Sequence, residues 1–420
     1  MRFCKKWATD LNLRPSQASN YKTIQTAVCL FAAYTTYLKI KISMKINIKT
    51  TVAALVLALV LPLHAQAQGA GRAAKPKKKI KWTSMAPKLG DDFFATPEAA
   101  RIGDNLLFYQ HPSGGWPKNL QLHDELTDGM RKRIDGMKLK KRYATIDNKA
   151  TTTEITYLAR LYNATGQKKY LDAVVRGFGY MFEAQYDNGG WPQFYPLSEG
   201  YYTHITYNDD AMVNVLKLMR DAMKGKEPFG CLPDSVKAAA AVSLDKGVDC
   251  ILKTQVVQDG RPTVWCAQYG ENTLQPANAR AYELVSLSGQ ESDNIVLFLM
   301  SLSKPSPEVR RCVEDAVAWF KKSMIKGMRM EKFTNTDGKS DVHLVPCPQG
   351  DTPCQPLWAR FYTIDGNRPF FCDRDGVMRF DLSEIGYERR NGYRWYNSDG
   401  MKVLKRYESW ALKYGLDAAK

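Results

Sequence analysis

Apolar residues recur at helical spacing in several stretches of the chain, and long polar loops separate these stretches. In residues 151–162, Ile155, Leu158 and Leu161 lie on one helical face. Further helix candidates are residues 100–110, 169–185, 211–223, 235–253 and 398–415. The pattern predicts a mainly helical protein.

Two of these helices end in the same way, which indicates an internal repeat. Gln110 stands six residues before Trp116, and Gln185 stands six before Trp191, a period of 75. A looser third copy begins at Gln255, 70 residues after Gln185. Helix pairs recurring at this interval predict stacked helical hairpins. We therefore expect a mostly α fold, an incomplete (α/α) toroid of about three hairpins with long loops and minor β structure, in which each repeat delivers its loop to the same face.

Residues 341–400 lose the helical period and are rich in Arg, Gly and aromatic residues. Arg360 and Arg374 stand fourteen residues apart in this stretch, each beside aromatic residues or a tight turn. Such arginines can stack on aromatic rings and fix long loops, which suits most of them. A subset could instead bind a carboxylate in a two-pronged contact.

The net charge of +17 is unevenly spread along the chain. Most of the excess lies in the first 81 residues, where GRAAKPKKKIK at 71–81 carries six bases and no acid. The remainder is nearly neutral. A nucleic-acid partner therefore has little support, and the basic stretch is typical of a solvated linker.

Residues 44–67 have the pattern of a secretory signal peptide. Two lysines precede an apolar run at 52–63, and Ala65-Gln66-Ala67 forms a small-x-small cleavage site. The run is too short to span a bilayer, so we expect an exported, periplasmic or extracellular protein with no membrane span after processing. The predicted organisation is an over-extended N-terminus at 1–43, the signal peptide at 44–67, a basic flexible linker at 68–92 and a catalytic domain at 93–420.

Seven cysteines remain after residue 67, and this odd number leaves at least one thiol unpaired. Their irregular spacing lacks the repeat of a metal site. Cys347 and Cys354 flank a Pro-containing loop and could form a disulfide; buried free thiols are the alternative.

The loop from Trp191 to Asp210 carries the first candidate chemistry. Asp209 and Asp210 come just before the helix at 211–223, where one acid suffices as a cap. The other could hold a cation or act in acid-base chemistry beside Trp191 and Tyr195, which we expect to line a substrate cleft. If the repeat loops converge, the acids and amides at Asp147, Asn148, Asp209, Asp210, Glu271 and Glu283 could meet Arg280 in one cleft.

Several long motifs in order carry a family resemblance. They are GGWPKN, TIDNKAT, EAQYDNGGWPQFYP, ITYNDDAM, WCAQYGENTLQPANARAYELVSLSGQES and ARFYTIDGNRPFFCDRDG. Over residues 99–412 the chain resembles pectate lyases of polysaccharide lyase family ten. The resemblance implies a helical toroid that cleaves polygalacturonate by calcium-assisted β-elimination, giving 4,5-unsaturated oligogalacturonides.

The resemblance also assigns roles to residues of this chain. Asp147, Asn148 and Asp209 match the calcium site, and Arg280 matches the catalytic arginine. Arg360 and Arg374 match arginines that bind substrate carboxylates, and we add Trp191, Tyr195 and Asp210 as substrate-binding residues. One departure is Gly270-Glu271, where an Asp is expected after WCAQY. We expect the protein to act as a monomer.

The chemistry of a uronate suits these residue types. A hard cation on the C6 carboxylate stabilises the charge that develops when the weakly acidic C5 proton leaves, and Asp and Asn oxygens suit calcium. Arginine is a demanding base because its pKa lies above about 12. It implies either an alkaline optimum or crowded positive charge that lowers that pKa.

Two rival functions remain open. An α/α-toroid glycoside hydrolase would use two acids from Asp147, Asp209 and Asp210 with water, without a metal, and its products would lack a double bond. A non-catalytic module would bind acidic glycan without turnover. Placing Arg280 among repeated acids favours the lyase, because a binding module needs no acidified carbon.

Overall fold

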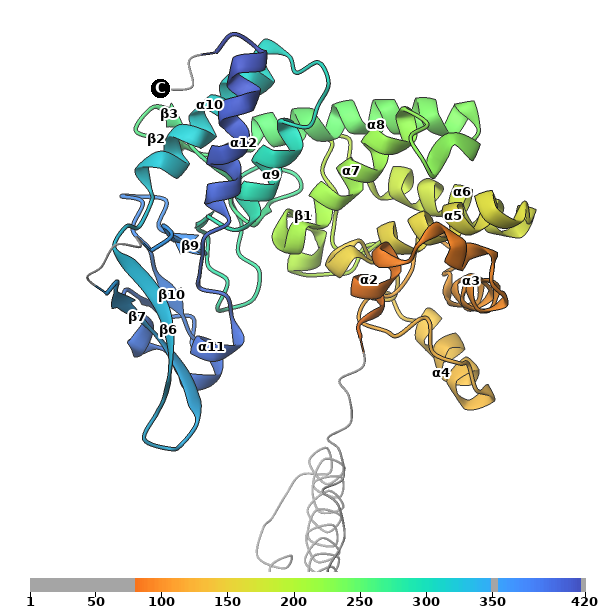
Figure 1. The fold of residues 1–420 in the computed structure, drawn as a ribbon, viewed down its shortest axis with the longest axis horizontal. Helices are drawn as coiled ribbons and strands as arrows, with labels where there is room; N and C mark the ends of the chain where they lie inside the picture. Colours follow the sequence, from red (N-terminus) through yellow and green to blue (C-terminus); the bar gives the residue numbers. More distant parts are fainter. Residues whose placement is uncertain (1–79, 349–353, 417–420) are drawn as a thin grey trace, which may run out of the picture. The chain divides into compact units, whose positions relative to one another are not determined.

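Helical hairpins make up most of the computed structural model, which describes residues 80–348 and 354–416 (Figure 1). Within these residues four hairpins follow one another. They are α3 (Pro97–Tyr109) with α5 (Thr152–Thr165), α6 (Lys168–Ala184) with α7 (Ala211–Met223), α8 (Asp234–Lys253) with α9 (Glu291–Leu299), and α10 (Pro307–Lys322) with α12 (Gly400–Lys413). The mainly helical class is confirmed, with one hairpin more than expected. The sequence pattern missed α9 and α10, and the toroid stays a prediction.

Short elements fill the loops of the hairpins. The helices are α2 (Trp82–Met85), α4 (Asp128–Lys138), α11 (Tyr387–Gly392) and the 3-10 turns η1 (Ala86–Lys88), η2 (Asp91–Ala95), η3 (Asp147–Lys149), η4 (Tyr201–Thr203), η5 (Asn208–Asp210), η6 (Phe229–Cys231) and η7 (Leu382–Glu384). The strands pair two by two and antiparallel: β1 (Ile205–Thr206) with β4 (Gln268–Tyr269), β2 (Val257–Gln258) with β3 (Arg261–Pro262), β5 (Leu287–Ser288) with β9 (Phe361–Tyr362), β6 (Met328–Thr334) with β7 (Ser340–Pro346), β8 (Trp358–Ala359) with β12 (Tyr396–Asn397), and β10 (Phe371–Cys372) with β11 (Met378–Arg379). This agrees with the minor β structure expected.

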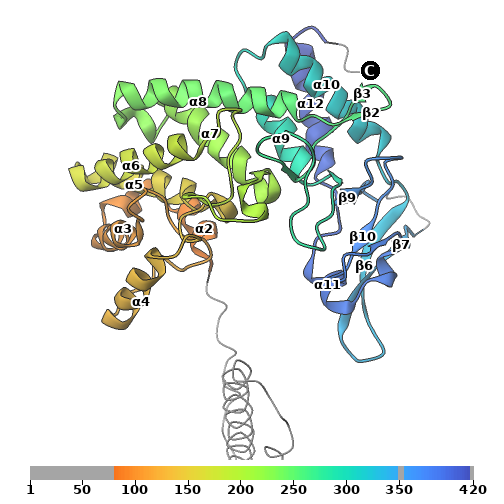
Figure 2. The ribbon, with the colours of Figure 1, turned by 180° about the vertical axis from the view of Figure 1, so that it is seen from behind.

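Local sequence sets the ends of the helices. The Thr96 hydroxyl accepts a bond from the Ala99 N–H at 3.2 Å, and Pro97 follows at the first helical position, where no donor is needed. Gly166 ends α5 in the left-handed conformation, with φ 66°. The turn after α5 is therefore tight, and α6 begins two residues later. Figure 2 shows from behind how α6 then lies between α5 and α8.

The repeated tryptophans are fully buried and make the same bond in each copy. Trp116, Trp191 and Trp265 each donate from Nε1 to a main-chain carbonyl of the preceding helix at 2.8 Å. A fourth copy follows α10, because Trp358 donates to the Phe320 carbonyl at 3.0 Å. The repeat read from the sequence is thus a packing unit.

The repeated glutamines tie each hairpin to the next. Gln110, Gln185 and Gln255 each donate from Nε2 to a carbonyl of their own loop and to a carbonyl of the following outer helix, at 2.8 to 3.0 Å. The receiving carbonyls on the helices belong to Ala173, Ser243 and Cys312. Because these buried carbonyls need partners, the glutamines fix how the hairpins stack.

The first glycine of each Gly-Gly-Trp motif is required by a close approach. Gly114 and Gly189 have φ of 99° and 92°. A Cβ on Gly114 would lie 2.2 Å from the Arg176 carbonyl oxygen, and one on Gly189 would lie 2.0 Å from that of Lys246. These loops can therefore pass directly against α6 and α8.

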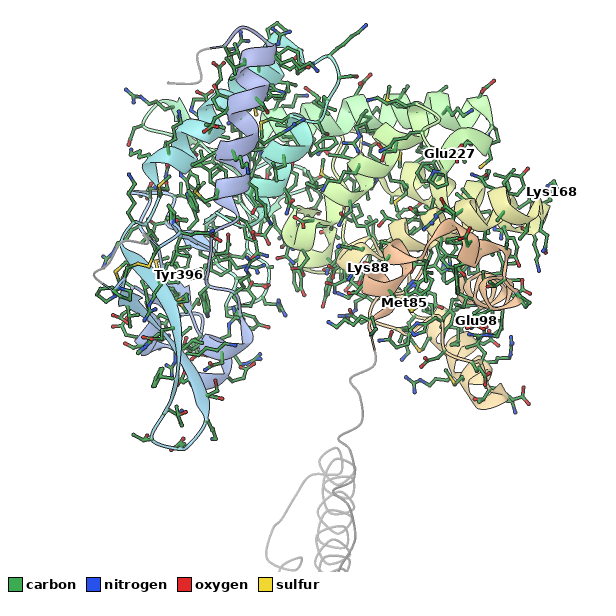
Figure 3. The ribbon with its side chains drawn as sticks, viewed as in Figure 1. Met85, Lys88, Glu98, Lys168, Glu227 and Tyr396 are labelled. Atoms are coloured by element: carbon green, nitrogen blue, oxygen red, sulfur yellow. A yellow bond between two sulfur atoms is a disulfide. The ribbon has the colours of Figure 1, made fainter. Side chains whose placement is uncertain are left out.

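A second, smaller core lies under the irregular C-terminal loops. It contains Phe361, Phe370, Phe371, Leu382 and Trp395, which are all buried. Tyr396 of β12, labelled in Figure 3, packs on it with its ring centroid 5.6 Å from that of Phe371. This core holds in place the stretch that carries Arg360 and Arg374.

The ordered part begins before the predicted domain boundary at residue 93. Trp82 of α2 is buried, and its Nε1 donates to Glu154 Oε1 at 2.7 Å. The C-terminal part of the expected flexible linker therefore belongs to the core, since an apolar ring and a buried carboxylate stabilise it there. Residues 1–79, with the expected signal peptide, lie outside the described residues.

Two further expectations concern sulfur and membranes. Cys347 and Cys354 form a disulfide, and the other five cysteines of the described residues are free. None of the helices between residues 80 and 416 is both long and apolar enough to cross a membrane.

Candidate active site

The site is built from loops that occupy equivalent places in successive hairpins. The backbone N–H groups of Thr145, Thr206 and Ser288 donate to the carbonyls of the three repeated tryptophans at 3.1, 3.1 and 2.8 Å. The polar residues that follow then lie at matching positions. Asn148 and Asp209 share an unusual left-handed backbone, with φ of 52° and 53°, which Asn and Asp adopt more readily than most residues.

Figure 3 helps to place these loops. Lys168 and Glu227 are labelled at the turn ends of the first two hairpins, and the loops that carry Asp147 and Asp209 leave from the opposite helix ends. Asn163, in the last turn of α5, donates to Glu227 Oε2 at 3.0 Å, which joins the two turns. Each hairpin thus separates a structural end from a chemical end.

Asp147 is buried and only half satisfied. Its Oδ2 accepts bonds from Lys118 Nζ and from Gln193 Nε2, the latter at 2.5 Å. Its Oδ1 has no hydrogen-bond partner in the part of the chain that the structure describes. A buried carboxylate oxygen without a partner is costly, so this oxygen is available to a ligand. Asn148 lies beside it and donates to Asn119 Oδ1 at 3.3 Å.

Asp209 faces the same place from the second hairpin. Partial burial and the negative charges of Glu291 and Asp147 raise its pKa, and Arg360 opposes them. The carboxylate is 42% exposed and lies 3.8 Å from the nearest nitrogen of Arg360. Excess negative charge therefore gathers around an accessible oxygen.

Arg360 is the buried cation of the site. It donates to Glu291 Oε1 at 2.9 Å, to Gln290 Oε1 at 3.1 Å and to Asn208 Oδ1 at 3.4 Å. Its guanidinium also lies 4.3 Å from the centre of the Tyr393 ring. The structure brings this predicted substrate-binding residue to the site, but holds it among protein partners with 5% exposure.

Asp210 contacts the third hairpin. It accepts a bond from Asn294 of α9 at 3.2 Å, and burial together with the charge of Glu291 raises its pKa to about 6. The neighbouring Asp293 is buried, and burial and the charge of Asp210 raise its pKa to about 8. Asp210 therefore lies within an acidic group, and its contact with substrate stays a prediction.

Arg280 forms a two-pronged ion pair with Glu283. Its Nε donates to Glu283 Oε2 at 2.8 Å and its Nη2 donates to Oε1. These bonds raise the pKa of Arg280 above its ordinary value. Crowded positive charge that lowers the pKa of this arginine, one of the two situations expected from the sequence, is not what the structure has.

Arg374 reaches the same neighbourhood through an aromatic ring. Its guanidinium lies 5.2 Å from the centre of the Tyr282 ring, and that of Arg280 lies 4.9 Å from it. Arg374 is exposed and donates to both oxygens of Glu388, at 2.9 and 3.0 Å. The two arginines, distant in sequence, thus share one tyrosine.

The aromatic expectation is corrected for Trp191. Its side chain is fully buried, since its ring packs beneath the loop and Nε1 is satisfied by the Met181 carbonyl. It therefore offers no face to a sugar and acts as a core residue. Tyr195 is half-buried, with its ring 5.9 Å from that of Tyr180, and its role stays a prediction.

Sequence reasoning missed some residues of the site. Lys118 and Gln193, which hold Asp147, each stand two positions after a repeated tryptophan, so aligning the repeat would have found them. Glu291 had no signal, because its helix was not predicted. Glu271, expected to converge with the other acids, instead accepts a bond at its main-chain carbonyl from Asn188.

The donor set suits a hard cation only in part. Asp147 Oδ1 is without a partner, and Asp209 carries a raised pKa among other acids, which a cation would offset. No three His, Cys, Asp or Glu side chains in the described residues lie close enough to hold a metal by themselves. A calcium ion here would need amide, water or substrate oxygens in addition.

Comparison with known proteins identifies the family. The model of the family described as pectic acid lyase matches residues 110–404. This chain belongs to that family. No curated protein matches it. A solved family 10 polysaccharide lyase from Cellvibrio cellulosa is 35% identical, with 77% of this chain and 95% of the other covered and a TM-score of 0.63.

A second solved structure is a mutant of the Cellvibrio cellulosa enzyme in complex with trigalaturonic acid. It is 34% identical, covers 78% of this chain and 99% of its own, and has a TM-score of 0.63. These relatives confirm the family named from the sequence motifs. The residue roles are a separate matter, for which the geometry above gives the support.

Proposed function

We propose that this member of the pectic acid lyase family is a pectate lyase that cleaves polygalacturonate by calcium-assisted β-elimination. Its products would be 4,5-unsaturated oligogalacturonides. The observation that carries the proposal is that Asp147, Asp209 and Arg360, from three separate hairpins or loops, meet at one place beside the Arg280 pair. The trigalacturonate bound to the related mutant supports the substrate class.

The cation would be held by Asp147, Asn148 and Asp209. When bound, it would withdraw charge from the C6 carboxylate of the sugar and so acidify C5. Lys118 and Gln193 keep Asp147 oriented by bonding its Oδ2, which leaves Oδ1 for the ion. Arg360, Arg374, Tyr195 and Asp210 are the proposed substrate contacts.

Arg280 would take the C5 proton in its neutral form. As the proton leaves, the C4–O4 bond breaks, a C4–C5 double bond forms, and the departing oxygen takes a proton from solvent. Because Glu283 raises the pKa of Arg280, the neutral form is scarce near neutrality. The reaction should therefore be faster at alkaline pH.

The protein is proposed to act as an exported monomer, periplasmic or extracellular. This rests on the signal-like pattern at residues 44–67, which lies outside the described residues.

The deciding measurement is ultraviolet absorbance of unsaturated uronides while the protein acts on polygalacturonate at alkaline pH. We expect absorbance to rise with calcium and to stop rising with a chelator. New reducing ends without absorbance would mean hydrolysis. Binding without either product would mean a glycan-binding protein, and both results would contradict the proposal.

A further inference from the structure

We propose that Glu283 is a positioning residue that fixes the guanidinium of Arg280 for the reaction and thereby sets how alkaline the medium must be. This inference rests on the proposed function of Arg280 as the base. It goes beyond that function because it assigns a task to a second side chain that never needs to touch the substrate.

The contact leaves Arg280 little freedom to turn. Glu283 uses both carboxylate oxygens on the guanidinium, binding Nε at 2.8 Å and also Nη2. A planar fork paired with a carboxylate in this way has one preferred orientation. Arg280 also has no other carboxylate partner among the described residues.

The backbone closes the same turn and holds Glu283 in place. The Glu283 N–H donates to the Arg280 carbonyl at 2.7 Å, and the Ala279 N–H donates to the Glu283 carbonyl at 3.1 Å. The Arg280 N–H in addition reaches Glu283 Oε2 at 3.3 Å. Because the turn bonds to itself on both sides, the carboxylate is a fixed point and the arginine takes its direction from it.

Burial of the pair is one-sided. The side chain of Glu283 is 11% exposed and that of Arg280 is 46% exposed. The two nitrogens bound by Glu283 are Nε and Nη2, and Nη1 makes no hydrogen bond within the described residues. Nη1 is therefore the nitrogen left to meet a substrate proton, and Glu283 decides where it points.

The surrounding charges favour an ionised Glu283. Burial alone would raise its pKa, but the bonds and charge of Arg280, helped by Arg360, lower it below the ordinary value. The titratable and charged groups that face the pair are Tyr201 of η4, Asp209 of η5, Tyr282 of the same turn, Arg360 after β8, Tyr393 after α11, and, across the Tyr282 ring, Arg374 and Arg389. A permanent negative charge on Arg280 improves its placement and makes its proton harder to lose.

Glu283→Gln separates these two effects, because it removes the charge but keeps the shape and one acceptor oxygen. We expect the midpoint of the alkaline rise in kcat to move to lower pH by about one unit or more, the size of shift that one close opposite charge produces. We also expect the maximal kcat to fall, since the two-pronged contact is lost. Glu308→Gln, the same change in the exposed Glu308–Arg311 pair of α10, should leave the midpoint unchanged.

A second measurement does not need turnover. The rate at which phenylglyoxal, an arginine-selective reagent, modifies Arg280 can be followed by mass spectrometry of its peptide at several pH values. We expect faster modification in Glu283→Gln than in the natural protein at each pH. This readout decides the matter if the variant is inactive.

The proposal is overturned if neither the kcat midpoint nor the reactivity of Arg280 changes, or if both move to higher pH. Failure of the proposed function has different signs. The natural protein would then give no unsaturated product, or Arg280→Ala would keep its turnover. The two ideas can therefore fail separately.

Discussion

Single residues of the site carry unbalanced charge, and that imbalance is what makes them reactive. Asp147 is buried with one oxygen unsatisfied, while Asp209 has its pKa raised by burial, Glu291 and Asp147. Arg280 has its pKa raised by the opposite sign of neighbour, Glu283. Acids that hold excess charge beside an arginine that holds its proton tightly describe a site that needs both a cation and alkaline medium.

Asp147→Asn should weaken calcium binding by about tenfold or more, since the charge of the ligands sets calcium affinity. The initial rate of elimination should fall, and more calcium should be needed to reach half of its maximum. Titration calorimetry with calcium and initial rates over a calcium series measure both effects. Asp172→Asn, in an exposed pair with Lys168 on α6, is the control, and equal calcium affinity in all three proteins would contradict the role of Asp147.

Asp293→Asn should change the pH dependence of stability rather than the chemistry. Burial, with the charges of Asp210 and Asp399, raises the pKa of Asp293 to about 8, well above the value of about 3.9 expected in the unfolded chain. Folding is therefore favoured by the protonated form below pH 4, and that contribution is lost as pH rises toward 8.

The Asn variant lacks this loss, so its free energy of unfolding should exceed that of the natural protein by at least about 1 kcal/mol above pH 8. Urea unfolding at acidic and alkaline pH tests this. A difference between the two proteins that stays constant with pH would contradict the assignment.

At the scale of elements, one motif is used repeatedly to stack hairpins. A glutamine bonds the next outer helix, a tryptophan bonds its own helix, and a glycine lets the loop pass close by. For the second hairpin these are Gln185, Trp191 and Gly189. Because the loop leaves this motif in a fixed direction, the acids after it are delivered to matching positions.

Gly189→Ala tests how much that close approach matters. The new methyl group would meet the Lys246 carbonyl oxygen, so we expect a loss of unfolding free energy of about 3 kcal/mol or more. Gly260→Ala is the matched control, because Gly260 also has a positive φ but nothing near its absent Cβ. Its loss should be about 1 to 2 kcal/mol, from backbone strain alone. Equal losses in chemical denaturation would show that the contact is unimportant.

At the scale of the whole molecule, the fold reaches further toward the N-terminus than the repeat does. Trp82 lies outside the predicted domain of residues 93–420, yet it is buried and bonds Glu154. Burial raises the pKa of Glu154 to about 7, and the bond from Trp82 opposes this. The first helices therefore depend on a segment that composition alone marks as linker.

A chain that starts at residue 93 should be less stable than one that starts at residue 80. Losing the buried Trp82 ring should cost about 3 kcal/mol, and Glu154 would lose its donor. Unfolding midpoints in urea compare the two chains. Equal midpoints would restore the boundary at residue 93.

The sequence by itself determined the helical class, the repeat and the family. Apolar spacing and the recurring Gln and Trp are local patterns, and the motifs around Asp147, Asp209 and Arg280 are long enough to be specific. Local patterns could not show that Trp191 is core, because an aromatic residue in a loop is equally compatible with a buried and an exposed ring. Nor could they predict α9, whose short apolar run lacks a clear period.

Only the tertiary structure decided how the charges pair. Lys118 and Gln193 meet Asp147 across 29 and 46 residues of chain. Arg360 meets Glu291 and Asp209 across still longer separations. Such contacts depend on how the hairpins stack, because the distance between two charges in space does not follow from their distance in sequence. Whether Arg280 has a raised or a lowered pKa was therefore settled by the position of one carboxylate, that of Glu283.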